Sequence, residues 1–124
     1  TIDLSGVQVA VGETPEIKHQ FESLVLPPKG CVVLFGGGEI QQGNGQCVNS
    51  VAQSSLKLIN SGTTISLISQ GVPIETVIYE DAGGNDQSLV RWPELIGDFT
   101  LHGGIDESSG SLFSPGAQVN GQSF

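Results

Sequence analysis

The chain has 124 residues, of which 13 are Asp or Glu and 4 are Lys or Arg, giving a formal net charge of -9. This length suits one domain, and the acidic balance excludes binding to the nucleic-acid backbone, which depends on Lys and Arg, while it disfavours attachment to anionic membranes. The charged fraction of 14% excludes a coiled coil, and the 18 glycines follow no three-residue period, which excludes collagen.

The first part of the chain predicts short strands separated by glycine-rich or proline-rich breaks. Residues 7–11 alternate apolar with small or polar side chains, as a half-buried strand does. A second strand is predicted over 18–26, ended by Pro27 and Pro28, which cannot donate to a ladder. The five apolar residues of 31–35, ended by glycines, predict a strand buried on both faces. A weaker strand follows over 47–51.

The later part of the chain holds the clearest strand pattern. Segments 64–69 and 73–79 both alternate, and Gly71 between them predicts a hairpin. A short strand is predicted over 88–92, followed by an irregular, surface-hugging tail over 93–124. About six to eight short antiparallel strands, with turn signals about every ten residues, predict an all-β sandwich formed by one domain over 1–124.

The two cysteines, Cys31 and Cys47, lie sixteen positions apart. The midpoint between them falls in a glycine-rich stretch, 36–43, which is typical of a loop. This symmetry predicts that the thiols face each other across one hairpin, where a disulfide would contribute roughly 3 kcal/mol. Two free buried thiols, packing as small apolar groups, are the alternative.

A set of motifs in fixed order carries a family resemblance. The motifs begin with Ile-Asp-Leu-Ser-Gly at 2–6, include Leu-Pro-Pro-Lys-Gly at 26–30, and continue at 32–38, 56–67, 74–79, 87–102 and 113–116. Together they resemble the lamin tail domain, the immunoglobulin-like module at the C-terminal end of nuclear lamins. The C-terminal motifs are similar to the branch of this family found in bacterial secreted and surface proteins.

The resemblance implies an immunoglobulin-like β-sandwich with two departures. Val7 stands where the family has a tryptophan, and the chain starts at Thr1, where the family's N-terminal strands would have ended. Missing N-terminal strands would leave an exposed sheet edge that invites pairing. We therefore expect a non-catalytic structural or protein-interaction module of a larger secreted or cell-surface protein. Its partner would be another protein, or a second copy paired through that edge.

Enzymatic chemistry is not indicated. The two histidines, His19 and His102, accompany no Gly-x-Ser-x-Gly nucleophile motif. We expect Asp98 and His102 to cap or brace a loop, and we expect no required cofactor. Membrane insertion is not predicted either, because no stretch approaches about 20 apolar residues.

A calcium-binding or glycan-binding accessory module is the alternative function. Glu80, Asp81, Asn85 and Asp86 place four oxygen-bearing side chains in one loop, and calcium takes 6–8 oxygen ligands. Their spacing lacks the alternate-residue pattern of a dedicated calcium loop, so a solvated turn is the other interpretation. A second acidic pair stands at 106–107.

The adjacent residues Arg91 and Trp92 are candidate contacts for a protein or sugar. An exposed tryptophan beside a cation suits either kind of partner. The competing interpretation is that Trp92 covers the open end of the sandwich.

Overall fold

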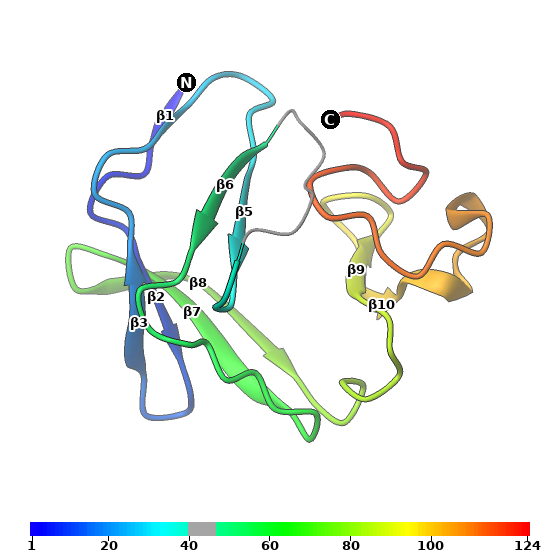
Figure 1. Ribbon diagram of the computed structural model, residues 1–124, viewed down its shortest axis with the longest axis horizontal. Helices are drawn as coiled ribbons and strands as arrows, with labels where there is room; N and C mark the ends of the chain where they lie inside the picture. Colours follow the sequence, from blue (N-terminus) through cyan, green and yellow to red (C-terminus); the bar gives the residue numbers. More distant parts are fainter. Residues whose placement is uncertain (40–46) are drawn as a thin grey trace.

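The structure, a computed structural model, describes residues 1–39 and 47–124 (Figure 1). Strands dominate the described residues and helix is almost absent, which confirms the all-β class. The strands are β1 (Ile2–Asp3), β2 (Gln8–Val11), β3 (Glu16–Gln20), β4 (Val25–Leu26), β5 (Val32–Phe35), β6 (Val48–Val51), β7 (Thr63–Ser69), β8 (Val72–Tyr79), β9 (Leu89–Trp92) and β10 (Asp98–Leu101). Two short 3-10 helices, η1 (His102–Gly104) and η2 (Asp106–Ser108), follow β10.

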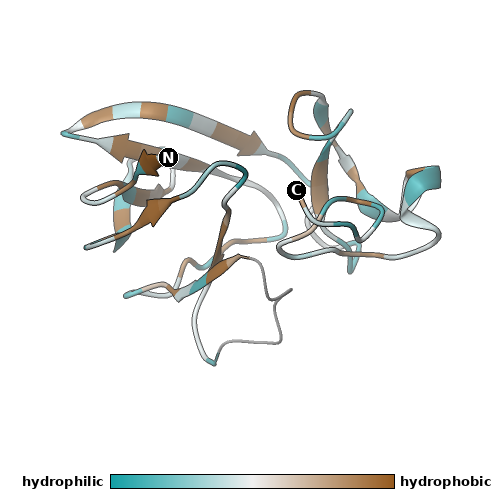
Figure 2. Ribbon diagram, turned by 90° about the horizontal axis from the view of Figure 1, so that it is seen from above, coloured by the Kyte–Doolittle hydropathy of each residue, from teal (hydrophilic) through white to brown (hydrophobic). Residues whose placement is uncertain are grey.

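The largest sheet is antiparallel and has the strand order β3-β2-β7-β8. Its two longest strands form the predicted hairpin, closed by Gln70 and Gly71, which both have positive φ angles. Brown and teal bands alternate along these long strands in Figure 2, as the sequence pattern predicts. The hairpin prediction is therefore confirmed.

The main core packs against one face of this sheet. Val9 of β2 pairs with Leu67 of β7, and Val11 pairs with Ile65, so these side chains share a face. The buried cluster consists of Val7, Val9, Val11, Phe21, Leu24, Leu26, Ala52 and Leu56. Val7 thus occupies a core position, and burying one such aliphatic side chain contributes about 1.5–3 kcal/mol.

The remaining described strands form three two-stranded sheets, β1-β4, β5-β6 and β9-β10. Strands β5 and β6 are parallel, so the prediction that Cys31 and Cys47 flank one hairpin is wrong. The cysteines nevertheless form a disulfide, with a Cα–Cα distance of 4.7 Å. The reason is the register: Val32 pairs with Val48, so the residues that precede each strand lie side by side.

Several predicted segments differ from the observed ones. The stretch 18–26 is split into β3 and β4: the hydrogen bond from the Phe21 amide to the Val7 carbonyl continues the β2–β3 register, and regular pairing is interrupted at 22–24 before β4 begins. Each residue of β5 is only partly buried, so the prediction of a strand buried on both faces is wrong. The described strands outnumber the six to eight expected.

The C-terminal segment is more ordered than predicted. The stretch 93–124 contains β10, which pairs antiparallel with β9 from Asp98–Trp92 to Leu101–Leu89, and then η1 and η2. In Figures 1 and 2, β9, β10 and the residues after them lie to one side of the four-stranded sheet. The expectation of an irregular tail is wrong for 98–108.

Candidate functional site

An open pocket of about 530 Å³ lies beside the β9–β10 hairpin. We call it the β9 pocket, and it is defined here by Arg91, Glu94, Leu95, Phe99, Phe113 and Ser114. Leu95 and Phe113 are largely exposed at its border, and Phe99 is partly exposed. The pocket therefore combines apolar walls with one cation, one carboxylate and two hydroxyls, from Ser88 and Ser114, a composition typical of ligand and peptide sites.

Three contacts fix the Arg91 side chain in this pocket. The register of the hairpin pairs Arg91 with Phe99, and the guanidinium carbon lies 4.4 Å from the centre of the Phe99 ring. One guanidinium nitrogen donates to the Gly97 carbonyl at 3.1 Å. The other lies 3.7 Å from a carboxylate oxygen of Glu75 in β8. Arg91 thus presents a cation whose position is set by its neighbours.

Trp92 does not share this surface. It is the last residue of β9, is partly buried, and joins Pro93 through a cis peptide bond. Consecutive strand residues point to opposite faces of a sheet. The structure therefore separates the two side chains that the sequence pairs as a candidate contact, and only Arg91 borders the pocket.

The buried side chain of His102 connects two parts of the C-terminal segment by hydrogen bonds. The fully buried His102 has Nδ1 at 2.7 Å from the Ser111 carbonyl oxygen and Nε2 at 2.8 Å from Ser114 Oγ. A carbonyl oxygen only accepts, so Nδ1 donates to the Ser111 carbonyl, while Nε2 forms a hydrogen bond with the Ser114 hydroxyl, which also lies 3.4 Å from the Ala117 carbonyl oxygen. This confirms that His102 braces a loop. Asp98, paired with it in the prediction, instead lies exposed in β10.

The Ser114–His102 contact has the composition of a serine nucleophile and its base, but its surroundings differ. In a catalytic triad, a carboxylate faces Nδ1 and stabilises the protonated ring. Here Nδ1 faces a neutral carbonyl, and the ring is enclosed. We assign this pair a structural role.

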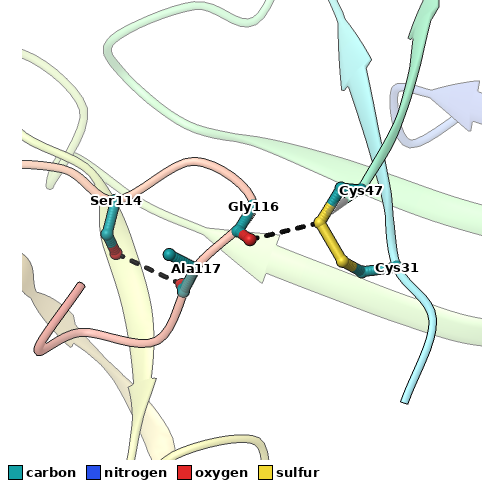
Figure 3. The surroundings of a disulfide bond; sticks show 5 residues. All are labelled: Cys31, Cys47, Ser114, Gly116 and Ala117. Carbon is teal, nitrogen blue, oxygen red and sulfur yellow. Dashed lines mark hydrogen bonds between the residues drawn. A yellow bond between two sulfur atoms is a disulfide. The ribbon is translucent and has the colours of Figure 1, made fainter. Parts of the chain in front are cut away.

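The disulfide lies against the turn formed by residues 114–117 (Figure 3). The Ala117 amide donates to the Ser114 carbonyl at 3.0 Å, and Gly116 has a φ of +75°, as a turn with Pro115 before glycine requires. Cys47 Sγ lies 3.2 Å from the Gly116 carbonyl oxygen, a sulfur–oxygen contact because a bridged sulfur has no proton to donate.

The acidic loop after β8 does not gather its carboxylates. The side-chain amide of Asn85 donates to the Ala82 carbonyl at 2.7 Å, so it closes the loop. Across 1–39 and 47–124, no group of three or more His, Cys, Asp or Glu side chains is placed to hold a metal ion. Calcium binding by Glu80, Asp81, Asn85 and Asp86 stays a prediction, which calorimetric titration with calcium tests.

His19 is a second buried histidine. Its ring packs edge-to-face on Phe21 at 4.7 Å, and its Nε2 lies 3.4 Å from Ser50 Oγ. Its Nδ1 is buried without a hydrogen-bond partner among the described residues. Burial lowers the pKa of His19 from its ordinary value. The ring therefore packs as a neutral group between β3 and β6.

Sequence reasoning missed five of the six residues that define the β9 pocket, namely Glu94, Leu95, Phe99, Phe113 and Ser114. They are far from Arg91 in the sequence or lie in the stretch expected to be irregular, and no local pattern marks them. Comparison with protein-family models, curated proteins and solved structures finds no match for this chain. Within the described residues, no helix has the length and apolar character needed to cross a membrane.

Proposed function

We propose that the chain is a non-catalytic structural or protein-interaction module, built as an immunoglobulin-like β-sandwich similar to the lamin tail domain. The ordered motifs support this family, and the antiparallel four-stranded sheet with its core on one face supports a sandwich. The step from fold to function is made by analogy, so it needs a feature of this chain's own surface.

The surface feature that supports an interaction role is the edge strand β8, which has a strand neighbour on one side in the described part of the chain. The opposite edge, β3, is covered: the Gln20 amide donates to the Gln53 side chain at 3.1 Å, and the Ser54 amide donates to the Lys18 carbonyl at 2.9 Å. Within the described residues, β8 pairs with β7 alone. Its side chains Val72, Ile74 and Ile78 are 61%, 55% and 69% exposed. A long apolar edge is a template for strand pairing.

Photo-cross-linking tests whether this edge contacts another protein. A photoreactive amino acid at Thr76 in β8 should form adducts with a polypeptide when the intact protein is irradiated on the cells that produce it. The same group at Thr14, exposed in the turn between β2 and β3, is the control. Equal adduct yields at the two positions would contradict an interaction role for β8.

The disulfide supports the secreted or cell-surface part of the proposal. Disulfides form and persist in oxidising compartments and are rare in the cytosol. We expect Cys31 and Cys47 to resist alkylation in intact cells until a reductant is added. Alkylation of both thiols without reductant would argue for a reducing compartment.

The β9 pocket favours one alternative, a glycan-binding accessory module. Phe99 and Phe113 offer exposed rings beside Arg91, and aromatic faces with a few polar donors are suited to sugars. Amide chemical-shift changes at 89–99 during titration with oligosaccharides, lost in Phe113→Ala, would support this alternative. Unchanged spectra across a panel of sugars would remove it.

A further inference from the structure

The half of the chain that contains β8 is strongly acidic. Residues 58–124 carry eight of the 13 acidic side chains and one cation, Arg91. Three of these carboxylates lie in β8 or directly after it, at Glu75, Glu80 and Asp81. All three residues are exposed. The free edge is therefore both apolar and negatively charged, whereas edge strands are commonly protected by lysines.

We propose that the β8 edge binds an extended segment of a partner protein in which Lys or Arg alternates with apolar residues. The segment would pair with β8 as a fifth strand of the sheet. This inference rests on the proposed interaction function and adds the chemistry of the partner.

The geometry of β8 fits a strand as its occupant. It spans eight residues, and at about 3.3 Å per residue it offers an edge about 25 Å long. Ile74 and Ile78 provide apolar contact at both ends of this edge. In strand addition, main-chain hydrogen bonds supply affinity and alternate side chains supply specificity.

Glu75 supplies the charge that selects a basic segment. Its side chain is 56% exposed and lies 3.7 Å from the Arg91 guanidinium, which is longer than a strong charge-assisted hydrogen bond. The carboxylate therefore remains accessible to a second cation. Glu80 and Asp81, just beyond the strand, are exposed and add negative charge at the C-terminal end of β8.

A second copy of this chain fits the edge less well. Full antiparallel pairing of two β8 strands aligns Val72 with Tyr79 and Glu75 with Thr76, so the two Glu75 side chains point to opposite faces, and the net negative charge of each chain is what disfavours this arrangement. Parallel in-register pairing places the two Glu75 side chains directly opposite each other. Like charges across strands are destabilising, and each chain carries a net charge of -9.

Peptide titration followed by NMR tests the charge requirement. Two eight-residue peptides are compared, one alternating Val with Lys and the other alternating Val with Glu. The Lys peptide should shift the backbone amides of β8 and spare those of β3. Its affinity should fall as salt rises, since exposed charges are screened. The Glu peptide should bind at least about tenfold more weakly.

Two variants with the same change of charge locate the site. Ile78→Lys removes an apolar contact of the edge and adds a repelling cation, so it should weaken binding of the Lys peptide about tenfold. Ile17→Lys, on the covered β3 edge, is the matched control and should change binding less than about twofold. Glu75→Gln should weaken it about two- to fivefold, the size of one exposed ion pair.

Three results would overturn the inference. Equal binding of both peptides at β8 would leave the edge as a docking site but remove the requirement for a basic partner. Concentration-dependent dimers lost in Ile78→Lys would identify a second copy as the occupant. Loss of peptide binding in Ile17→Lys and Ile78→Lys alike would show attraction to the overall charge instead of the edge.

Discussion

At the scale of single residues, the contact between His102 and Ser114 shows how a polar group stabilises a loop-rich segment. The imidazole is buried, and both of its nitrogens have partners within 3 Å. Removing the Ser114 hydroxyl would leave Nε2 unsatisfied, because the enclosed ring has no access to water. A buried polar atom without a partner costs about 1–3 kcal/mol.

Ser114→Ala should therefore lower the free energy of unfolding by about 1–3 kcal/mol. Ser111→Ala is the matched control, because among the described residues its exposed hydroxyl bonds only to the Phe113 carbonyl, and its own carbonyl still accepts from His102. That control should change stability by less than about 0.5 kcal/mol. Urea denaturation of the two variants measures both effects, and equal losses would contradict the structural role of the Ser114–His102 contact.

His19 makes stability depend on pH. Burial lowers its pKa in the folded chain below the ordinary value of 6.5 that it regains on unfolding. Above pH 6.5 the ring is neutral in both states, and its contribution to stability is fully present. As pH falls through 6.5, the unfolded state binds the proton more readily, so stability declines until the pH is below the folded pKa.

Urea denaturation at several pH values between 7.5 and 5 should show this decline. In a His19→Gln variant, the difference in stability between the two ends of this range should be smaller than in the unmodified chain. An identical pH dependence in both proteins would assign the titration to another group.

At the scale of elements, the β7–β8 hairpin depends on close backbone approach at its open end. Gly62, just before β7, has a φ of +108°, and a Cβ there would overlap the Tyr79 carbonyl oxygen. At the closed end, Gly71 has a φ of +78° with open space around its Cβ position. The two glycines thus differ in steric demand while sharing a positive φ.

Gly62→Ala should therefore destabilise the protein more than Gly71→Ala. We expect a loss of about 1–2 kcal/mol at Gly71, from backbone strain alone. At Gly62 the clash with backbone adds to this strain, so the loss should exceed about 2 kcal/mol. Thermal unfolding of both variants makes the comparison, and the reverse ranking would contradict the observed closure of the hairpin.

The elements predicted best are those whose signals are local. The β7–β8 hairpin follows from two alternating segments around Gly71, and its turn needs no distant partner. The direction of β6 relative to β5 could not be predicted from local sequence. The spacing of Cys31 and Cys47 fits a hairpin and a parallel register equally well. Strand β10 was missed because its short sequence becomes a strand through its pairing with β9.

The candidate site could be predicted only in part for the same reason. Arg91 is visible as a rare cation, but Phe113 and Ser114 reach its pocket through the path of the C-terminal segment, which no periodicity encodes. Arg91 and Trp92 do not form one contact surface, because neighbouring residues of a strand point to opposite faces of the sheet.

At the scale of the whole molecule, the disulfide links the central strands to the C-terminal segment. Cys47 contacts the Gly116 carbonyl, and a Cβ at Gly116 would lie 3.0 Å from Cys47 Sγ. The position of the turn at Ser114 therefore depends on a cysteine nearly 70 residues earlier in the chain.

Replacing both cysteines by alanine should lower the free energy of unfolding by about 3 kcal/mol, the value for a closed loop of this length. Hydrogen exchange at the Ala117 amide should accelerate more than at the Val9 amide, since the former depends on the turn beside the disulfide. Equal acceleration at both amides would mean that the bridge stabilises the fold globally without holding this turn.

The bridge also determines how the module would respond to a stretching force. The two cysteine Cα atoms are 4.7 Å apart, although sixteen residues of chain separate them in sequence. A force applied to the two ends of the module is transmitted through the disulfide bond, so it does not extend the stretch between Cys31 and Cys47. Fully extended, the stretch would add about 50 Å to the molecule. With the disulfide intact, a linker built from this module therefore has a shorter maximum reach, and it gains the length of this stretch only after reduction.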